Sequence, residues 1–236
     1  MAAVYVALGD SMSIDDYAGG VGRGAASLLL CNHDTDFPDW AGRDLATAGY
    51  TGQILARDGA VSSDVLERQL PLIDRRPALV TITMGGNDLL ATYGDSAAAR
   101  SVIDRVAATG DAILSRLRAL AADCRVIITT VYDPSDGTGD VPAAGLPAWT
   151  DASRLVAELN QALTALANRH GAAVADVHRR FLGHGTAAGD PAQSDPRPTN
   201  RGLWYCGVIE PNAWGAAEIR RAWWDSLAGT IDSARS

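Results

Sequence analysis

The stretch that decides the fold is VYVALGDSM, residues 4–12. Its apolar residues, several of them β-branched or aromatic, predict a strand, and Gly9-Asp10-Ser11 predicts a tight turn directly after it. Gly9 gives the backbone the conformational freedom that such a turn needs. Ser11 then stands just beyond the carboxyl end of a strand, where open α/β sheets hold their reactive groups.

A serine in that position has two interpretations. It can be a nucleophile, provided that a base lies nearby and that donors are present for the oxyanion. It can also be an ordinary turn residue whose hydroxyl binds its own backbone. The remaining chain has to be searched for the base and the donors before one interpretation is preferred.

Four further apolar runs predict strands, at residues 53–56, 78–84, 124–131 and 172–177. Helices are predicted between and after them, at residues 38–49, about 63–70, about 102–120, 151–169 and beyond Pro211. Gly110 lies inside the long third helix, where a glycine can kink or divide it. The last helix has an inward-facing stripe of four residues, which are Ile219, Trp223, Leu227 and Ile231.

This alternation of strands and helices predicts a single domain over residues 1–236. The fold class is α/β, a three-layer α/β/α sandwich with a five-stranded parallel sheet of flavodoxin-like type. Right-handed crossovers bring the carboxyl ends of all the strands to one edge of the sheet. Ser11, Gly59, Asn87 and the loops after Val131 and over residues 178–210 should therefore converge there, which favours the functional interpretation of Ser11.

Three strand-end turns now stand in order along the chain: Gly9–Met12, Asp58–Ala60 and Gly85–Asp88. They resemble the first three sequence blocks of the SGNH, or GDSL-type, hydrolase family. The segment Ile209–Gly215 is similar to the fourth block, where the family usually has Asp-x-x-His-Pro followed by a helix. The resemblance covers nearly the whole chain, and the ordered set is more specific than any one block.

The resemblance implies a role for each matching residue. Ser11 corresponds to the nucleophile, and the oxyanion hole would consist of its own N–H, the N–H of Gly59 and the side-chain amide of Asn87. Pre-placed neutral donors of this kind are what a tetrahedral oxyanion requires. The alternative for Gly59 and Asn87 is turn chemistry, with glycine supplying a positive φ and asparagine an Asx-turn.

The last block departs from the family, because Glu210 stands where a histidine is expected and Gly207 where an aspartate is expected. One possibility is a shifted triad of Ser11, His184 and Glu210, with His184 reaching in from the loop after the fifth strand. A second is that Glu210 is itself the base, which requires burial to raise its pKa. A third is an inactive site.

These observations predict a serine hydrolase that cleaves carboxylic esters with small acyl or acetyl groups through an acyl-enzyme. The alternative is a catalytically impaired binding protein of the same fold, for a small acyl or sugar ligand. A small-molecule ester is the expected partner, no cofactor is expected, and the oligomeric state is left open. No two histidines or cysteines have the spacing of metal ligands, so no metal is expected.

Charge and hydropathy exclude two further classes of binding partner, nucleic acids and membranes. The formal net charge is -8, and no cluster of Lys and Arg is present, so a nucleic-acid partner is not expected. No apolar run approaches the roughly 20 residues that span a bilayer, so no membrane partner is expected. The start of the chain lacks the features of a signal peptide, which favours a cytoplasmic location.

Overall fold

The computed structural model describes residues 2–194, 197 and 199–233, the last six of them by their backbone only. Five strands form one sheet in the order β2-β1-β3-β4-β5, and every neighbouring pair is parallel. Their bounds are β1 Ala3–Leu8, β2 Tyr50–Ile54, β3 Leu79–Ile82, β4 Arg125–Thr129 and β5 Ala173–Ala175. This arrangement confirms the predicted α/β fold and its parallel sheet.

Strand β1 lies inside the sheet, between β2 and β3, and its side chains alternate between two cores. Val4, Val6 and Leu8 face one hydrophobic cluster. Tyr5 and Ala7 face the other. Both faces of the sheet are therefore covered, which is why the strand is an unbroken apolar run rather than an apolar–polar alternation.

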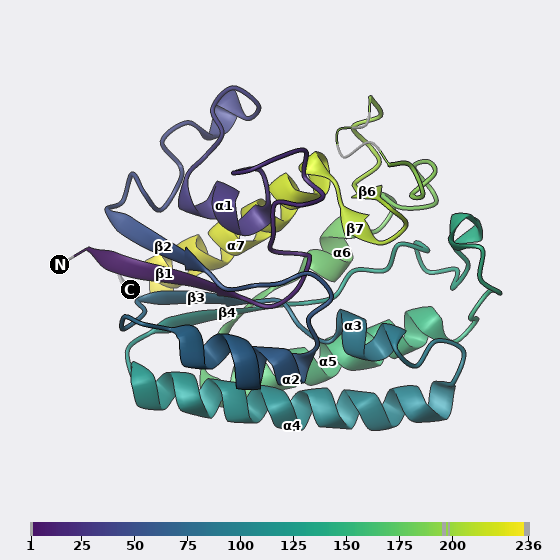
Figure 1. The fold of residues 1–236 in the computed structure, drawn as a ribbon, viewed down its shortest axis with the longest axis horizontal. Coiled ribbons are helices and arrows are strands. Elements are labelled where there is room, and N and C mark those ends of the chain that lie inside the picture. Colours follow the sequence, from purple (N-terminus) through teal and green to yellow (C-terminus); the bar gives the residue numbers. More distant parts are fainter. Residues whose placement is uncertain (1, 195–196, 198, 234–236) are drawn as a thin grey trace.

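Helices cover each face of the sheet (Figure 1). One layer contains α1 (Ala25–Leu30), α6 (Val177–Phe181) and α7 (Ala213–Ser233). The opposite layer contains α2 (Ser62–Asp64), α3 (Gly86–Leu90), α4 (Ser96–Leu120) and α5 (Ala152–His170). The inward-facing residues Ile219, Trp223 and Leu227 of α7 are buried as predicted, and the side chain of Ile231 lies outside the described residues.

The helix predicted over residues 38–49 is wrong. Only the single 3-10 turn Pro38–Trp40 forms, and the chain then continues through turns. Gly42 and Gly49 both have positive φ values, and the Asp44 carboxylate accepts hydrogen bonds from the N–H groups of Asn32 and Thr47. These side-chain bonds replace helical ones. The helix that connects β1 to β2 lies earlier in the chain, in α1 (Ala25–Leu30), and the sequence pattern did not predict it.

Gly110 neither kinks nor divides the long helix, because α4 runs without a break from Ser96 to Leu120. A Cβ atom at Gly110 would lie 2.4 Å from Leu166 Cδ2 and 2.8 Å from Met84 Cε. The glycine therefore allows α4 to pack closely against α5 and the end of β3. Close helix packing, and not a bend in the helix, therefore explains why a glycine stands at position 110.

Beyond the strand ends the chain forms a small antiparallel pair of strands, β6 (Tyr205–Cys206) and β7 (Glu210–Pro211). In Figure 1 this pair lies on the side toward which β1 points. The loops after β3 and β4 reach the same side. No helix in the described residues is long and apolar enough to cross a membrane.

Candidate active site

The turn that carries Ser11 is held by buried polar side chains from two other segments. Gly9 exchanges two hydrogen bonds with Gln69: its N–H donates to Oε1 at 2.7 Å, and its carbonyl accepts from Nε2 at 2.8 Å. The N–H of Asp10 donates to Thr83 Oγ1 at 3.0 Å. Because both partners are buried, breaking either contact would leave an unsatisfied polar group, so the turn has one well-defined geometry.

Gly9 is required at this turn. Its φ is +127°, and a Cβ atom there would lie 2.1 Å from the carbonyl oxygen of Thr83. Any L side chain would therefore meet both an unfavourable backbone conformation and a backbone atom that cannot move aside.

Ser11 is buried, with 7% of its surface exposed. Its hydroxyl lies close enough to Glu210 to lower the pKa of that carboxyl, against the larger effect of burial. Its backbone N–H donates to no acceptor within the described part of the chain. The neighbouring Asp10 carboxylate accepts a hydrogen bond from the N–H of Met12 at 3.1 Å, so Asp10 shapes the turn.

The second and third strand-end turns are tied to each other. Asn87 Nδ2 donates to the carbonyl of Ala60 at 3.0 Å, which fixes its amide group. The Asp88 carboxylate accepts hydrogen bonds from the N–H and the hydroxyl of Ser62 at 2.9 and 2.6 Å. One hydrogen of Asn87 Nδ2 is thus used for positioning, and the amide nitrogen carries a second one.

Gly59 follows β2 and has a φ of +67°. It is exposed, and a Cβ atom there would meet nothing within 4 Å. No hydrogen bond from its N–H is found among the described residues. The turn lies beside the Ser11 turn, since the N–H of Arg57 donates to the carbonyl of Gly9 at 3.0 Å.

Glu210 is presented by the β6–β7 hairpin. Its ladder pairs Cys206 with Glu210, and the intervening Gly207 and Val208 both have positive φ. The Tyr132 hydroxyl donates to the carbonyl of Ile209 at 2.7 Å and so fixes the hairpin against the end of β4. Glu210 is therefore positioned by a loop outside the parallel sheet.

The hairpin is also joined to the last helix by Asn212. Its Nδ2 donates to the carbonyls of Leu203 and Tyr205, and its Oδ1 accepts from the N–H groups of Trp214 and Gly215. Asn212 thus caps α7 and at the same time fixes the connection that carries Glu210.

Burial raises the pKa of Glu210 from an ordinary 4.5 to about 7. The nearby Ser11 hydroxyl opposes this rise, while the negative charges of Asp58 and Asp10 add to it. The Oε2 atom is buried and has no hydrogen-bond partner among the described residues. Burial likewise raises the pKa of Asp10 to about 6. Glu210 therefore combines a place beside Ser11 with a basicity close to that of histidine.

His184 has different neighbours. Its Nδ1 lies 2.6 Å from the carbonyl oxygen of Gly202, and its ring is stacked on Trp204 with centroids 3.5 Å apart. Within the described residues no contact of His184 with Ser11 or Glu210 is recorded. The structure thus brings together Ser11, Asn87 and Glu210 with the Gly59 turn beside them, and it leaves His184 in another environment.

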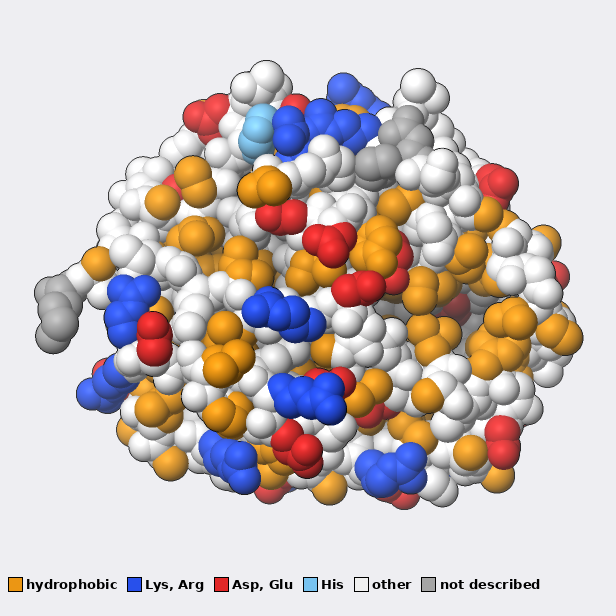
Figure 2. Space-filling view, viewed as in Figure 1, with side chains coloured by type: hydrophobic (Ala, Val, Ile, Leu, Met, Phe, Trp, Pro, Cys, Tyr) orange, Lys and Arg blue, Asp and Glu red, His pale blue; other side chains and the backbone are white. Residues whose placement is uncertain are grey.

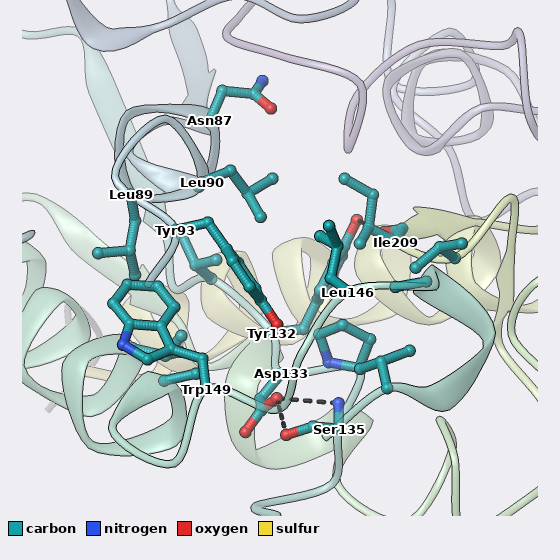
Figure 3. A pocket seen from close by; sticks show the side chains of 18 of the residues that line it. Asn87, Leu89, Leu90, Tyr93, Tyr132, Asp133, Ser135, Leu146, Trp149 and Ile209 are labelled. Atoms are coloured by element: carbon teal, nitrogen blue, oxygen red, sulfur yellow. Dashed lines mark hydrogen bonds between the residues drawn. The ribbon is translucent and has the colours of Figure 1, made fainter. Parts of the chain in front are cut away.

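An apolar pocket of about 370 Å³ opens beside Ser11 (Figure 3). Its walls come from α3, the loop over residues 131–149, the first turns of α5 and the Gly207–Ile209 segment. The sequence predicted that the loop after Val131 would reach this edge of the sheet. It did not identify Tyr93 or Trp149 as wall residues, because aromatic residues in such segments commonly pack inside the protein.

The described side chains include no group of three or more His, Cys, Asp or Glu that could hold a metal ion. The donors that line the site are a hydroxyl, an amide and backbone N–H groups. What the arrangement offers chemically is a hydroxyl next to a basic carboxylate, together with neutral hydrogen-bond donors.

Comparisons with known proteins identify the family of this chain. Residues 7–217 match the GDSL-like Lipase/Acylhydrolase family. A lipase from Streptomyces rimosus is 31% identical over 213 residues, which cover 79% of this chain and 74% of that lipase.

Two solved structures share the fold. One is an alpha/beta hydrolase enzyme from the metagenome of Lake Arreo in Spain, with a TM-score of 0.65, 20% identity and 97% of each chain covered. The other is phospholipase A1 from Streptomyces albidoflavus NA297, with a TM-score of 0.57, 24% identity, and 97% of this chain and 99% of that one covered.

Fold and relatives together define a carboxylic ester hydrolase. The chain belongs to the GDSL-like lipase/acylhydrolase family, which confirms the resemblance seen in its sequence blocks. The relatives favour an enzyme over the alternative of a binding protein.

Proposed function

We propose that this chain hydrolyses carboxylic esters through an acyl-enzyme on Ser11, with Glu210 as the base in place of the family's histidine. The observation that carries the proposal is the place of Glu210 beside the Ser11 hydroxyl, together with a carboxyl pKa that burial raises to about 7. A base with a pKa near the working pH both accepts a proton and returns it efficiently.

The reaction follows from the positions of these two groups. Ser11 Oγ attacks the ester carbonyl carbon, and its proton passes to the Glu210 carboxylate. The tetrahedral intermediate collapses, and the alcohol leaves with the proton from Glu210. Water then attacks the acyl-enzyme, Glu210 accepts a proton from it, and the same proton returns to Ser11 Oγ as the acid is released.

The oxyanion is bound by neutral donors. The N–H groups of Ser11 and Gly59 have no acceptor within the described residues, and Asn87 has one amide hydrogen beyond its bond to Ala60. These are the donors that the family resemblance assigns. Each donor of this kind contributes about 3 kcal/mol to lowering the barrier.

The contacts of His184 support Glu210 over the shifted triad. Its Nδ1 faces the carbonyl of Gly202, and one ring face is covered by Trp204. Within the described residues neither contact brings the ring to Ser11 or Glu210, so His184 would have to move to act as base. Glu210 needs no such movement, since its carboxyl already lies beside the Ser11 hydroxyl.

Three variants test this assignment in a short-chain ester assay: Ser11→Ala, Glu210→Gln and His184→Ala. We expect Ser11→Ala to abolish labelling by a fluorophosphonate probe, and Glu210→Gln to lower kcat/KM by about 10² to 10⁴. His184→Ala should change kcat/KM by less than about threefold. A loss with His184→Ala as large as that with Glu210→Gln would contradict the assignment.

The pH dependence gives a second test. Glu210 must be ionised to accept the proton, so kcat/KM should rise with pH through about 7, the pKa of this carboxyl. If Glu210 kept an ordinary carboxyl pKa, the rise would lie near pH 4.5 instead. A pH profile that is flat between 5 and 8 would therefore contradict a Glu210 base with a pKa of about 7.

A further inference from the structure

The pocket beside Ser11 offers a ligand polar partners at one end and mainly apolar walls elsewhere. Ser11 and Asn87 both line it, and Figure 3 shows Asn87 at the end opposite Trp149 and Asp133. Between these ends the labelled side chains are mostly hydrocarbon, with Leu89, Leu90 and Tyr93 on one side and Ile209 on the other. A ligand in this pocket therefore meets its polar partners only next to the nucleophile.

The aromatic residues of the wall have no free polar atom to offer. The Tyr93 hydroxyl donates to the carbonyl of Pro147 at 2.7 Å, and Trp149 Nε1 donates to Ser96 Oγ at 3.2 Å. The Tyr132 hydroxyl donates to the carbonyl of Ile209 at 2.7 Å. The three residues therefore present ring surface to the cavity.

The polar side chains at the far end are also satisfied by the protein. The buried Asp133 carboxylate accepts hydrogen bonds from the Ser135 hydroxyl at 2.5 Å and from Ser153 at 2.7 Å. It also accepts from the N–H groups of Ser135 and Gly137. A sugar placed here would bury its hydroxyl groups without partners, and each such group costs free energy.

We propose that this pocket holds the unbranched hydrocarbon chain of the acyl group, so that the preferred substrates are esters of medium-chain fatty acids, not acetyl esters. This inference rests on the proposed function, because it takes Ser11 as the atom that is acylated. It departs from the small acyl groups expected from the sequence. An acetyl group would leave most of the 370 Å³ cavity without a ligand.

The mouth of the pocket supports entry of an apolar chain. Three wall residues, Leu90, Tyr93 and Leu146, are 42%, 37% and 52% exposed despite being large and hydrophobic. Figure 2 shows hydrophobic side chains gathered around a hollow at the end of the molecule toward which the strands point. Such exposed apolar groups at the rim of a cavity are typical of a binding site.

The test is the chain-length dependence of kcat/KM with the p-nitrophenyl esters of acetate, butyrate, hexanoate and octanoate, all below the concentrations at which they form micelles. Each buried methylene contributes about 0.8 kcal/mol, so kcat/KM should rise about fourfold per methylene until the pocket is filled. A profile that is flat, or that falls after acetate, would overturn the proposal.

A pocket-filling variant localises the effect. Val156 lines the pocket from α5, and Val156→Phe places a ring where the end of the chain would lie. We expect kcat/KM for octanoate to fall at least tenfold while that for acetate stays within about threefold. Ala157→Phe is the control, since Ala157 is its neighbour on the same helix but does not line the pocket. Equal losses on both esters in Val156→Phe would contradict the assignment.

A binding measurement separates this inference from the catalytic proposal. The Ser11→Ala protein should bind methyl octanoate more tightly than methyl acetate. The change in tryptophan fluorescence on adding each ester measures the affinity. Adding Val156→Phe to this protein should remove the difference in affinity between the two esters. If wild type is not labelled at Ser11 but this preference is seen, the catalytic proposal fails and the acyl pocket stands. If Ser11 is labelled but no preference is found, the acyl pocket fails alone.

Discussion

The two segments that meet at the active site are built in different ways. The Ser11 turn is the end of a central strand, fixed by buried bonds to Gln69 and Thr83. The Cys206–Glu210 hairpin lies outside the parallel sheet and delivers a carboxyl whose Oε2 has no partner within the described residues.

This difference indicates which active-site residue can be replaced without disturbing the sheet. Moving the nucleophile would disturb the sheet, because its turn shares backbone and side-chain bonds with two other segments. Replacing the residue that faces it changes only a hairpin tip. In the proposed mechanism a glutamate stands where the family usually has a histidine, and burial supplies the basicity by raising the pKa of Glu210 to about 7.

The largest expected effect is on the Ser11 turn, the more rigid of the two segments. It comes from the variant Gly9→Ala. The new methyl group would meet the Thr83 carbonyl at 2.1 Å, so we expect the free energy of unfolding to fall by about 3 kcal/mol or more. Urea denaturation measures it. Gly59→Ala is the matched control: its φ is also positive but its surroundings are open, so a loss of about 1 kcal/mol is expected. Equal losses at both positions would show that close packing at Gly9 is not the cause.

The next largest effect concerns Asn87, the proposed oxyanion donor that joins the second and third turns. Asn87→Ala should lower kcat by about 10² to 10³, since one pre-placed donor is lost from the transition state. KM should change little, and the fluorophosphonate probe should still label Ser11, only more slowly. Asn168→Ala, at an exposed position of α5, serves as control and should leave kcat unchanged. A drop in kcat below about threefold for Asn87→Ala would remove this residue from the oxyanion hole.

The smallest expected effect concerns the hairpin, where the charge of Glu210 changes the stability of the protein. A carboxyl whose pKa is raised in the folded state binds its proton more tightly there than in the unfolded chain, so stability falls as the pH rises from about 4.5 to about 7. Above pH 7 the ionised Glu210 lowers the free energy of unfolding, and Glu210→Gln removes this destabilisation. We expect this variant to gain about 2 kcal/mol of unfolding free energy at pH 8 and little at pH 4.

Thermal unfolding at the two pH values measures that gain. Glu67→Gln, at an exposed position, is the control and should shift stability equally little at both. A Glu210→Gln protein that is less stable than wild type at pH 8 would mean that the charge of Glu210 stabilises the fold.

Much of the fold was accessible from the sequence, because unbroken apolar runs such as residues 78–84 are the signature of strands covered on both faces. The failures lie where local pattern and tertiary contacts disagree. Residues 38–49 look helical, yet the bonds of Asp44 hold them in turns. Gly110 looks like a break, yet it is a contact point between helices.

The sequence by itself determined the layered fold, the order of the strand-end turns and the position of Ser11, since these depend on periodicity and on short blocks that each act locally. Only the tertiary structure decided that Glu210, and not His184, lies against Ser11, and that a hydrocarbon-lined cavity opens beside it. Basicity and cavity shape arise from burial among residues far apart in the chain, and burial is a property of the folded protein alone.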